Sequence, residues 1–463
     1  MTPTNPERMD AIIIGTGQGG KPLAGALAEA GWNCAVIERD RIGGTCVIRG
    51  CTPTKTMVAS ARIAHLARRA SDYGIGTGEV TVDLSTVRKR KRDIVDAWSA
   101  GSRKGLERHP TLDLILGTAR FTAPGTVEVD LNDGGVRTLT SDHIFINVGA
   151  RNRIPDIAGL EAVDFLDSTS IMELDSVPGH LIVLGGGFIG LEFGQMFRRF
   201  GAEVTVVDHS GIAGREDSDI SEAIEKILRG EGIEIVYPAV PHTVASINGG
   251  VEVTVESGGQ ERVLRGSHLL VAVGIVPNSD TLNLSSAGIA VGERGEILVD
   301  DRCQTNVPGV WALGDVTGAP PFTHTAYDDY RIIANNVLEG GDASRNGRIL
   351  SYAVFIDPQL GRVGLSERDA EAAGLNYRVA KLPMSRVARA IEMDETRGFM
   401  KAVVDADTDE ILGAAILGIE GGEVVTVLQV AMMGGLPWTA LRDAMIAHPT
   451  LSESLNNLFM TLK

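Results

Sequence analysis

The stretch AIIIGTGQGG, residues 11–20, decides the fold class of this chain. Its first four residues form an apolar run typical of a buried strand, and the glycine-rich turn after them leads into an amphipathic helix that extends to about Ala30. A second apolar run follows at residues 34–37. Strand, turn, helix and strand in this order predict a βαβ unit.

The glycines of this turn indicate a nucleotide site. Gly15, Gly17 and Gly20 have the GxGxxG spacing, which permits a tight turn and a close approach of the backbone to a pyrophosphate at the helix N-terminus. Glu38 stands at the end of the second strand, where a carboxylate can bond ribose hydroxyls. A lone glycine motif could be a plain turn, but turn, helix and acid together predict a dinucleotide-binding fold.

A second copy of this pattern lies further along the chain. The turn GGGFIG, residues 185–190, also lies between two apolar runs, and Asp208 follows Gly187 by 21 residues, the spacing that separates Glu38 from Gly17. A protein with two dinucleotide sites is expected to transfer electrons between two dinucleotides. The residues of this second predicted site are Gly185, Gly187, Gly190 and Asp208.

Asp208 also bears on the identity of the nicotinamide nucleotide. A 2′-phosphate would meet a like charge at this carboxylate, which favours NADH over NADPH. His209 and Arg215 lie nearby in the sequence, so NADPH stays open as the alternative.

The composition argues against several classes of partner. Lys and Arg total 43 against 60 Asp and Glu in 463 residues, a net charge of −17, which disfavours nucleic acid and anionic membranes. No apolar stretch approaches the ~20 residues of a membrane span or the core of a signal peptide, so a cytoplasmic location is expected. The basic run at residues 88–92 is interpreted as the solvated face of a helix.

The remaining segments complete an α/β pattern. Helices are expected over residues 53–72 and 83–108, followed by a strand-rich return over 112–148. From Ser351 onward, strand-like runs followed by helices indicate a separate α+β unit.

The segment GGTCVIRGCTPTK, residues 43–55, carries the most chemical information. Cys46 and Cys51 can close a small disulfide ring, and Pro53 marks a helix that starts just after Cys51. The helix dipole and Lys55, on the same helix face, both favour a thiolate there. A redox-active pair is therefore predicted, with a zinc site or a structural disulfide as alternatives. Cys34 is expected in the core, and Cys303 has no partner within sequence reach.

This segment resembles the redox-active segment of the FAD-dependent pyridine nucleotide–disulfide oxidoreductases, and looks closest to their mercuric-reductase-like and dihydrolipoamide-dehydrogenase-like branch. The strings ALGD, residues 312–315, and IAHPTLSE, residues 446–453, are similar to two further motifs of the family. The resemblance covers the whole chain. It implies two Rossmann-like domains and a C-terminal α+β dimerisation domain. The expected segments are an FAD-binding domain over 1–150 and 279–346, an NAD(P)-binding domain over 151–278, and a dimerisation domain over 347–463.

The resemblance also implies roles in cofactor binding. Asp315 would bond the ribityl chain of FAD, and Thr118 with Ala119 would meet the adenine. The full implied FAD set is Gly15, Gly17, Gly20, Glu38, Thr45, Lys55, Thr118, Ala119, Gly149, Gly314 and Asp315. The implied NAD set is Gly185, Gly187, Phe188, Gly190, Asp208 and Gly274.

Two residues after the second glycine turn gain roles from the resemblance alone. Phe188 stands where related reductases carry a Tyr that gates the nicotinamide pocket, and Glu192 would pair with Lys55 near the flavin N5. Without the resemblance, the sequence predicts that Phe188 is a packing residue and that Glu192 is an exposed charge on a helix.

His448 and Glu453 would complete the catalytic set. In the family the matching His is the acid–base that protonates a departing thiolate, and the Glu orients it. This His comes from the partner subunit, so an obligatory homodimer is implied. A plainer alternative is that Thr450 and Glu453 form a capping box at the start of the last helix.

The resemblance implies that hydride passes from NADH through FAD to a disulfide formed by Cys46 and Cys51. Cys51 would hold the thiolate beside the flavin, and Cys46 would attack a small disulfide substrate. Dihydrolipoamide dehydrogenase, a metal-ion or quinone reductase, and a redox sensor that does not turn over are the alternatives. Ile48 and Ile275 depart from lipoamide dehydrogenases, and the ending LNNLFMTLK lacks the cysteine pair of mercuric reductases. No resident metal is expected.

Overall fold

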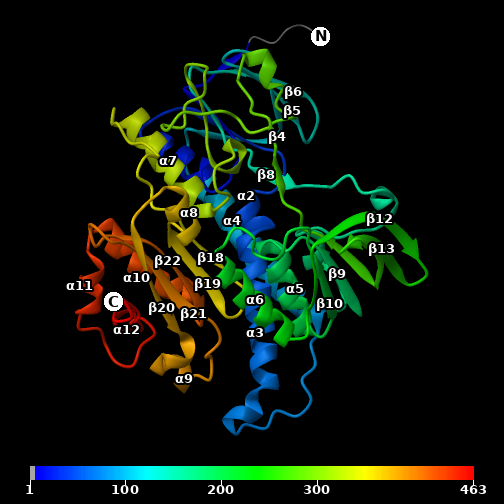
Figure 1. Ribbon diagram of the computed structural model, residues 1–463. Helices are drawn as coiled ribbons and strands as arrows, with labels where there is room; N and C mark the ends of the chain where they lie inside the picture. Colours follow the sequence, from blue (N-terminus) through cyan, green and yellow to red (C-terminus); the bar gives the residue numbers. More distant parts are fainter. Residues whose placement is uncertain (1–5, 463) are drawn as a thin grey trace. The chain divides into compact units, whose positions relative to one another are not determined.

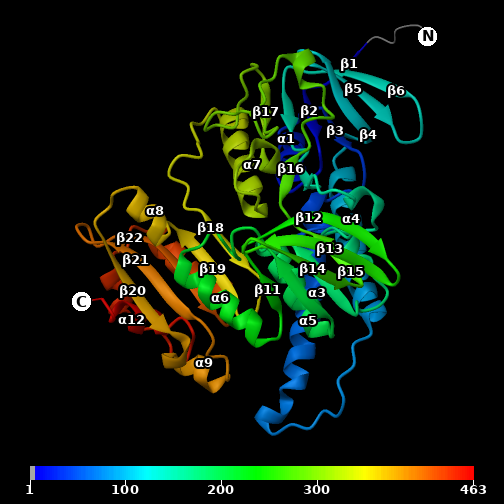
Figure 2. The same cartoon turned by 45° about the vertical axis from the view of Figure 1, so that its right-hand side comes forward.

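The computed structural model describes residues 6–462. Residues 1–5 and 463, at the outer ends of the first and last expected segments, lie outside the described part. The chain forms two compact units (Figures 1 and 2). Unit 1 comprises Met1–Thr56, Thr86–Arg153 and Gly274–Gly347, and unit 2 comprises Met57–Ser85, Ile154–Val273 and Arg348–Lys463.

Unit 1 is built on an eight-stranded sheet with the order β1-β6-β5-β4-β3-β2-β7-β17. The five strands from β4 to β17 are parallel, and their order along the chain gives the 3-2-1-4-5 arrangement of a Rossmann fold. The bounds are β1 Glu7–Arg8, β2 Ala11–Ile14, β3 Cys34–Glu38, β4 Leu112–Ala123, β5 Thr126–Leu131, β6 Val136–Thr140, β7 Ile144–Ile146 and β17 Val310–Ala312. A two-stranded ribbon pairs β8 Ala150–Asn152 with β16 Ile275–Pro277.

Strand β2 is entirely buried because every residue of its apolar run enters the core. Helix α1, Gly20–Glu29, follows it and contacts α7, Thr323–Leu338. The helices expected over 53–72 and 83–108 appear as α3, Cys51–Arg68, and α4, Leu84–Glu107. Most of the basic run on α4 is exposed as expected, but Lys91 is only 3% exposed, so the run is not wholly a solvated face.

Unit 2 repeats this plan with a smaller parallel sheet of order β11-β10-β9-β15. Helix α5, Phe188–Phe200, packs on β10 and β9, and α6, Ser218–Gly230, leads to β11. An antiparallel sheet of β12, β13 and β14 stands beside it as β5 and β6 do in unit 1. The bounds are β9 His180–Leu184, β10 Glu203–Val207, β11 Glu234–Val236, β12 Ala239–Ile247, β13 Gly250–Ser257, β14 Gln260–Gly266 and β15 His268–Val271. Both predicted βαβ units are therefore present.

The C-terminal part of unit 2 is the expected α+β structure. An antiparallel sheet of order β18-β19-β22-β21-β20 is covered by α10, which contacts β19 and β22, while α12 packs on β20 (Figure 1). The bounds are β18 Ser351–Val354, β19 Gln359–Gly364, α8 Glu367–Ala372, β20 Tyr377–Pro383, α9 Ala388–Glu392, β21 Phe399–Asp405, β22 Ile411–Gly418, α10 Gly421–Met433, α11 Trp438–Arg442 and α12 Ser454–Phe459.

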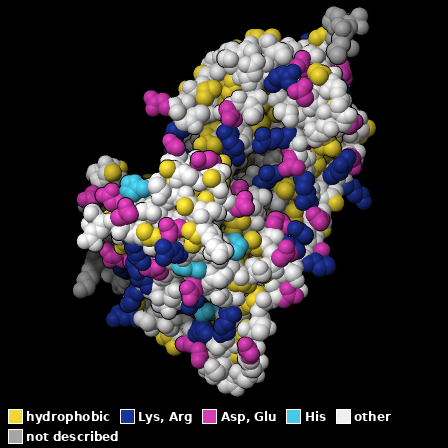
Figure 3. All heavy atoms as spheres, turned by 90° about the vertical axis from the view of Figure 1, so that its right-hand side faces the viewer, with side chains coloured by type: hydrophobic (Ala, Val, Ile, Leu, Met, Phe, Trp, Pro, Cys, Tyr) yellow, Lys and Arg dark blue, Asp and Glu magenta, His cyan; other side chains and the backbone are white. Residues whose placement is uncertain are grey.

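Two surface properties bear on the expected partners. Basic and acidic side chains are interspersed on the face drawn in Figure 3. Over residues 6–462, no helix combines the length and the apolar character that crossing a membrane requires.

Candidate functional site

The first glycine turn is shaped for close backbone contacts. A Cβ atom on Gly20 would lie 2.2 Å from the Gly15 carbonyl oxygen, and one on Gly15 would lie 2.2 Å from the Asn147 carbonyl oxygen. The Glu38 carboxylate accepts hydrogen bonds from the Thr16 amide at 3.0 Å and its hydroxyl at 2.6 Å. This cradle of backbone at the start of α1 fits a pyrophosphate, with Glu38 beside the ribose position.

The second turn has the same geometry in unit 2. A Cβ atom on Gly190 would lie 2.0 Å from the Gly185 carbonyl oxygen. Asp208 accepts a hydrogen bond from the Gly186 amide at 2.8 Å through one carboxylate oxygen, while the other accepts from the Ser210 and Gly211 amides. The equivalent bonds in the two turns explain why both copies keep the 21-residue spacing between glycine and acid.

Asn147, directly after β7, is a buried residue that contacts the first turn and that sequence reasoning missed. Its Oδ1 accepts from the Gly20 amide at 2.8 Å, and its Nδ2 donates to the Leu313 carbonyl at 3.0 Å. It therefore ties α1 to the segment that carries Gly314 and Asp315. A polar residue at the end of the apolar run 144–148 was the signal that could have found it.

The segment with Gly314 and Asp315 is held in place by the buried carboxylate of Asp329. Asp329, fully buried, accepts from the Gly314 amide at 2.9 Å and pairs with Arg345 at 2.6 Å. Burial, together with the charges of Cys51 and Asp329, raises the pKa of Asp315 to about 6. The carboxylate of Asp315 is thus held close to the cysteine pair, which fits a role in bonding FAD.

The cysteine segment is bonded directly to the first glycine turn. The Gly43 amide donates to the Thr16 hydroxyl at 3.1 Å, and the Gln18 amide group donates to the Gly43 carbonyl at 3.1 Å. A Cβ atom on Gly44 would lie 2.5 Å from the Cα of Gly17. The short helix α2, Gly44–Ile48, then carries Cys46.

Cys51 is the first residue of α3, which begins two residues before the predicted start at residue 53. Both Cys46 and Cys51 are free thiols, so the structure holds the dithiol form of the predicted pair. The Cys51 sulfur also lies 3.2 Å from the hydroxyl of Thr323, at the start of α7. Thr323 is 272 residues away, and no sequence spacing indicated it.

The two thiols have opposite proton affinities. A hydrogen bond from Cys46 lowers the pKa of Cys51 to about 6, and the Thr323 hydroxyl and the Lys55 ammonium lower it too, against the effect of burial. The same bond, together with burial, holds the pKa of the Cys46 thiol well above its usual range. The pair therefore carries a thiolate on Cys51 and a proton on Cys46 at neutral pH.

The Cys51 thiolate gives the reduced protein a defined pH dependence. Because its pKa lies below the usual range, the thiolate is present above about pH 6 and is lost as the pH falls through that value. Replacing Thr323 with Val removes one hydrogen bond to the thiolate and should move this midpoint up by about one pH unit. Absorbance of the NADH-reduced, FAD-loaded protein at long wavelength measures it. Thr138→Val on β6 is the control, and equal midpoints in both variants would contradict the assignment.

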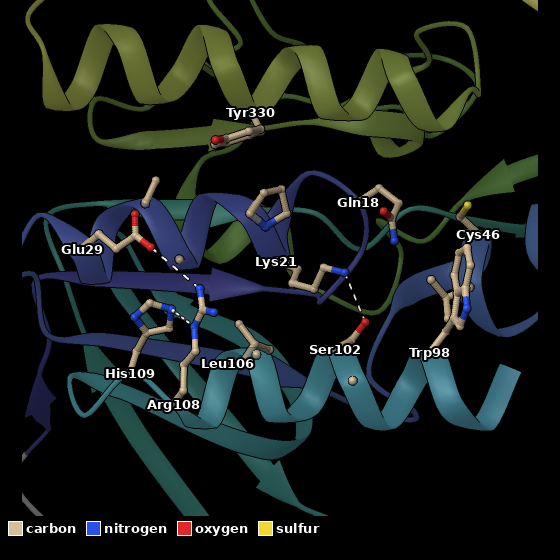
Figure 4. Close-up of a pocket in the computed structure, with 16 residues that line it drawn as sticks. Gln18, Lys21, Glu29, Cys46, Trp98, Ser102, Leu106, Arg108, His109 and Tyr330 are labelled. Carbon is tan, nitrogen blue, oxygen red and sulfur yellow. Dashed lines mark hydrogen bonds and ion pairs between the residues drawn. The ribbon is translucent and has the colours of Figure 1, made fainter. Parts of the chain in front are cut away.

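Cys46 also lines a cavity of about 570 Å³ in unit 1 (Figure 4). The walls come from one face of α1 and one face of α4, with Tyr330 of α7 opposite them. The cavity therefore leads from the surface to the sulfur of Cys46. A small molecule in it would reach this thiol.

Helix α5 of unit 2 carries two further predicted residues, Phe188 and Glu192. Glu192 is only 6% exposed and accepts from the Phe355 amide at 2.8 Å, so its interpretation as an exposed helix charge is wrong. The ring of Phe188 lies 5.6 Å from that of Tyr352. Tyr352 in turn donates to the buried Glu216 at 2.6 Å, so Phe188 packs on a tyrosine that a buried hydrogen bond holds in place. The expected pair of Glu192 with Lys55 joins residues of different units and stays a prediction.

His448 and Glu453 form the expected pair. The Nδ1 atom of His448 lies 2.8 and 3.0 Å from the two carboxylate oxygens of Glu453, and the His side chain is 67% exposed. The capping-box alternative is wrong, because the last helix begins at Ser454 and the Glu453 side chain does not cap it. The Thr450 hydroxyl accepts from the Glu453 amide at 3.1 Å and donates to the Ala447 carbonyl at 2.8 Å. The carboxylate fixes the imidazole so that Nε2 is left for a substrate.

The other predicted cofactor residues are placed as follows. Thr118, exposed, and Ala119, buried, are neighbours on β4 opposite Asp130 and Val129 of β5. Thr45 is exposed on α2, and Gly149 has a φ of 64° directly before β8. Gly274, assigned to the nicotinamide nucleotide, has a φ of 117° and belongs to unit 1, whereas the other residues of that set belong to unit 2.

Within residues 6–462, no group of three or more His, Cys, Asp or Glu side chains is arranged to hold a metal ion. The zinc alternative for the cysteine pair therefore gains no ligands from the described structure.

Comparison with known families gives two matches. Residues 9–329 match the model of the pyridine nucleotide-disulphide oxidoreductases, and residues 350–459 match the dimerisation domain of the same family.

Individual relatives match along almost the whole chain. A probable pyridine nucleotide-disulfide oxidoreductase, RclA of Escherichia coli K12, is 38% identical over 98% of this chain and 100% of its own length. A mercuric reductase of Bacillus cereus is 36% identical over 98% of this chain and 71% of its own length, and a dihydrolipoyl dehydrogenase of Geobacillus stearothermophilus is 31% identical over 96% and 94%. The solved Cu(II) complex of RclA, described as an HOCl-induced flavoprotein disulfide reductase, superposes with a TM-score of 0.90 at 37% identity and covers 99% of this chain and 100% of that one.

Proposed function

The chain belongs to the pyridine nucleotide-disulphide oxidoreductase family, and we propose that it uses NADH and FAD to drive a Cys46–Cys51 centre that reduces a small disulfide. The family is FAD-dependent and uses NAD(P)H. The observation that carries the proposal is the Cys51 thiol at the start of α3, whose pKa is lowered by Cys46, Thr323 and Lys55.

FAD, when bound, accepts hydride from the nicotinamide and passes two electrons to the cysteine pair. The protein's part is to hold it. The turn Gly15–Gly20 and Glu38 would bind its pyrophosphate and adenosine end, and Asp315 would bond its ribityl chain. The second turn and Asp208 would hold the nicotinamide nucleotide, with Phe188 covering its pocket.

The reduced cysteine pair then acts as a nucleophile and a resolving thiol. His448 takes the proton of the Cys46 thiol, and the Cys46 sulfur attacks one sulfur of the substrate disulfide, forms a mixed disulfide and expels the first substrate thiolate, which takes that proton from His448. The Cys51 thiolate then attacks the Cys46 sulfur and expels the second substrate thiolate, which takes a proton from solvent. One substrate disulfide becomes two thiols, and the Cys46–Cys51 disulfide is restored for the next reduction.

The His448 of this mechanism is expected to come from a second copy of the chain. Residues 350–459 match a dimerisation domain, which supports a homodimer. The same region exposes large apolar side chains, and exposed apolar surface of this kind is typical of an interface. The exposed large apolar residues between positions 350 and 459 are Leu365, Ile391, Val430, Met433, Leu436 and Met445.

A metal ion is the second candidate acceptor. The solved relative was captured as a Cu(II) complex, and a variant with one cysteine replaced by serine was captured likewise. A pair of thiols is also a soft ligand set that suits copper. NADH oxidation supported by Cu(II) but by no disulfide would favour this acceptor over the proposed one.

Nicotinamide specificity follows from Asp208. Both of its carboxylate oxygens are bonded to backbone amides, so the negative charge cannot swing away from a 2′-phosphate. We expect NADH to be preferred, and Asp208→Asn to reduce the ratio of kcat/KM for NADH over NADPH by about tenfold, which corresponds to roughly 1.4 kcal/mol. Steady-state kinetics with both nucleotides measure it.

The control for this prediction is Glu203→Gln, which removes a charge from an exposed residue of β10. The ratio of kcat/KM for NADH over NADPH should be unchanged in this control. A wild-type protein that prefers NADPH would contradict the assignment of Asp208.

The disulfide function is tested by stoichiometry. The FAD-loaded protein is mixed with NADH and a small disulfide under anaerobic conditions, and both NADH loss and thiol appearance are followed. The proposal requires two thiols for each NADH. NADH oxidation that stops after the protein itself is reduced would instead indicate a sensor that does not turn over.

A further inference from the structure

The cavity lined by Cys46 has glycines on both of the helices that form its walls, α1 and α4. Three glycines line it, Gly25 on α1 and Gly101 and Gly105 on α4. A Cβ atom on any of them would meet no other atom within 4 Å. Glycine weakens the interior of a helix relative to alanine, and no neighbouring atom explains its use at these positions. These three positions therefore leave open space along both helices of the cavity.

The charge in this cavity comes from Lys21. Its ammonium donates to the neutral hydroxyl of Ser102 at 3.2 Å, and within residues 6–462 it has no carboxylate partner. At the far end of the cavity, Glu29 lies 3.9 Å from Arg108, so those two charges largely offset each other. Figure 4 shows Lys21 between that pair and Cys46.

The Lys21 ammonium is also partly removed from water. Burial lowers its pKa, while the electrostatic interaction with Cys46 acts in the opposite direction. An ammonium that has lost part of its hydration gains from an anion placed against it. The chain as a whole carries a net charge of −17, so a cationic cavity is not an average property of its surface.

We infer that Lys21 makes this cavity selective for small disulfides that carry a carboxylate or another anionic group near the sulfur atoms. The inference rests on the proposed disulfide function and names its substrate class. An anionic group bonded to Lys21 and Ser102 would place the adjacent disulfide at the Cys46 sulfur, and the three glycines would admit its bulk.

The first test does not need turnover. In the NADH-reduced, FAD-loaded protein, Cys46 is alkylated with iodoacetate, which is anionic, and with iodoacetamide, which is neutral and of similar size. Peptide mass analysis reports the modification of Cys46. We call the iodoacetate rate divided by the iodoacetamide rate the alkylation ratio. Lys21→Met should lower this ratio by about five- to tenfold, because the Lys21 ammonium attracts only the anionic reagent. Lys104→Met, an exposed lysine of α4 that does not line the cavity, should leave the ratio unchanged.

The second test uses three disulfides that differ in charge. Dithiodipropionate is anionic, hydroxyethyl disulfide is neutral and cystamine is cationic. Lys21→Met should raise KM for dithiodipropionate by about tenfold, leave KM for hydroxyethyl disulfide unchanged and lower KM for cystamine. Gly105→Ala should raise KM for all three without lowering the melting temperature, because alanine favours the helix while filling the cavity.

The outcomes separate the two hypotheses. If the wild-type protein reduces none of the disulfides, the proposed function fails, but the alkylation ratio still tests Lys21. If disulfides are reduced and both the alkylation ratio and the KM values are the same in Lys21→Met and wild type, the charge selectivity is overturned and the disulfide function stands. A fall in the melting temperature of Gly105→Ala would show that the glycine serves packing instead of an incoming ligand.

Discussion

Cys46→Ser is expected to abolish disulfide reduction while FAD remains bound. Cys46 lines the cavity through which a substrate arrives, and a serine hydroxyl there cannot form the mixed disulfide. The rate of NADH-dependent disulfide reduction should fall by about three orders of magnitude or more. Flavin absorbance should be unchanged, because the side chain of Cys46 is not part of the glycine cradle.

The matched control for this variant is Cys34→Ala, which removes a thiol that is fully buried in β3. It should lose some stability, since a small cavity opens in the core, and retain activity. Full disulfide turnover in Cys46→Ser would contradict the assignment of the attacking thiol.

His448→Gln is expected to lower kcat for disulfide reduction by about 10²- to 10⁴-fold, the usual contribution of a positioned general acid. Glutamine can keep a hydrogen bond to Glu453 but cannot deliver a proton. Binding of FAD and reduction of the protein by NADH should be unaffected, because these steps do not use the His448 proton. The readouts are steady-state kcat and the rate of NADH reduction in a stopped-flow instrument.

Mixed dimers show whether the site is shared between subunits. Co-expressed Cys46→Ser and His448→Gln chains form some dimers in which one site combines the intact cysteine pair of one chain with the intact His448 of the other. Activity should recover to about a quarter of the wild-type value if chains mix at random in a twofold dimer. No recovery would mean that both groups must come from one chain, and the shared-site proposal would fail.

The two nucleotide folds could be predicted because their signals are local. Strand, glycine turn, helix and acid lie within a short stretch of sequence, and close backbone approach at Gly15 and Gly185 leaves glycine as the residue that fits there. The cysteine pair and the helix start near Cys51 were predictable for the same reason. His448 and Glu453 were found because they are five residues apart.

The contacts that tune the site could not be predicted, because they join distant parts of the chain. Thr323 reaches Cys51 from 272 residues away, and Asn147 reaches Leu313 from 166 residues away. Glu192 was predicted to be exposed because glutamate is usually a surface residue. A buried carboxylate requires a hydrogen-bond partner that only the fold supplies, and here that partner is the Phe355 amide. No role was predicted for Lys21 from the sequence, because a charged residue on an amphipathic helix is ordinarily solvated.

The start of the last helix shows how two local rules can compete. The T-x-x-E spacing at Thr450 fits a capping box that would start the helix at Leu451, but the carboxylate of Glu453 binds His448 and the helix begins at Ser454. The Glu453 carboxylate bonds the His448 imidazole and not the backbone amide of Thr450, which a capping box would require. Sequence spacing alone does not rank the two.

The most direct test of the central claim, a Cys51 thiolate in a redox pair with Cys46, is an anaerobic titration of the FAD-loaded protein with NADH, followed at long wavelength. We predict that a thiolate-to-flavin band grows as NADH is added, disappears when the pH falls below about 6, and is discharged by a small disulfide. Flavin bleaching at neutral pH with no such band, in a protein whose Cys46 and Cys51 remain unreduced, would contradict the account.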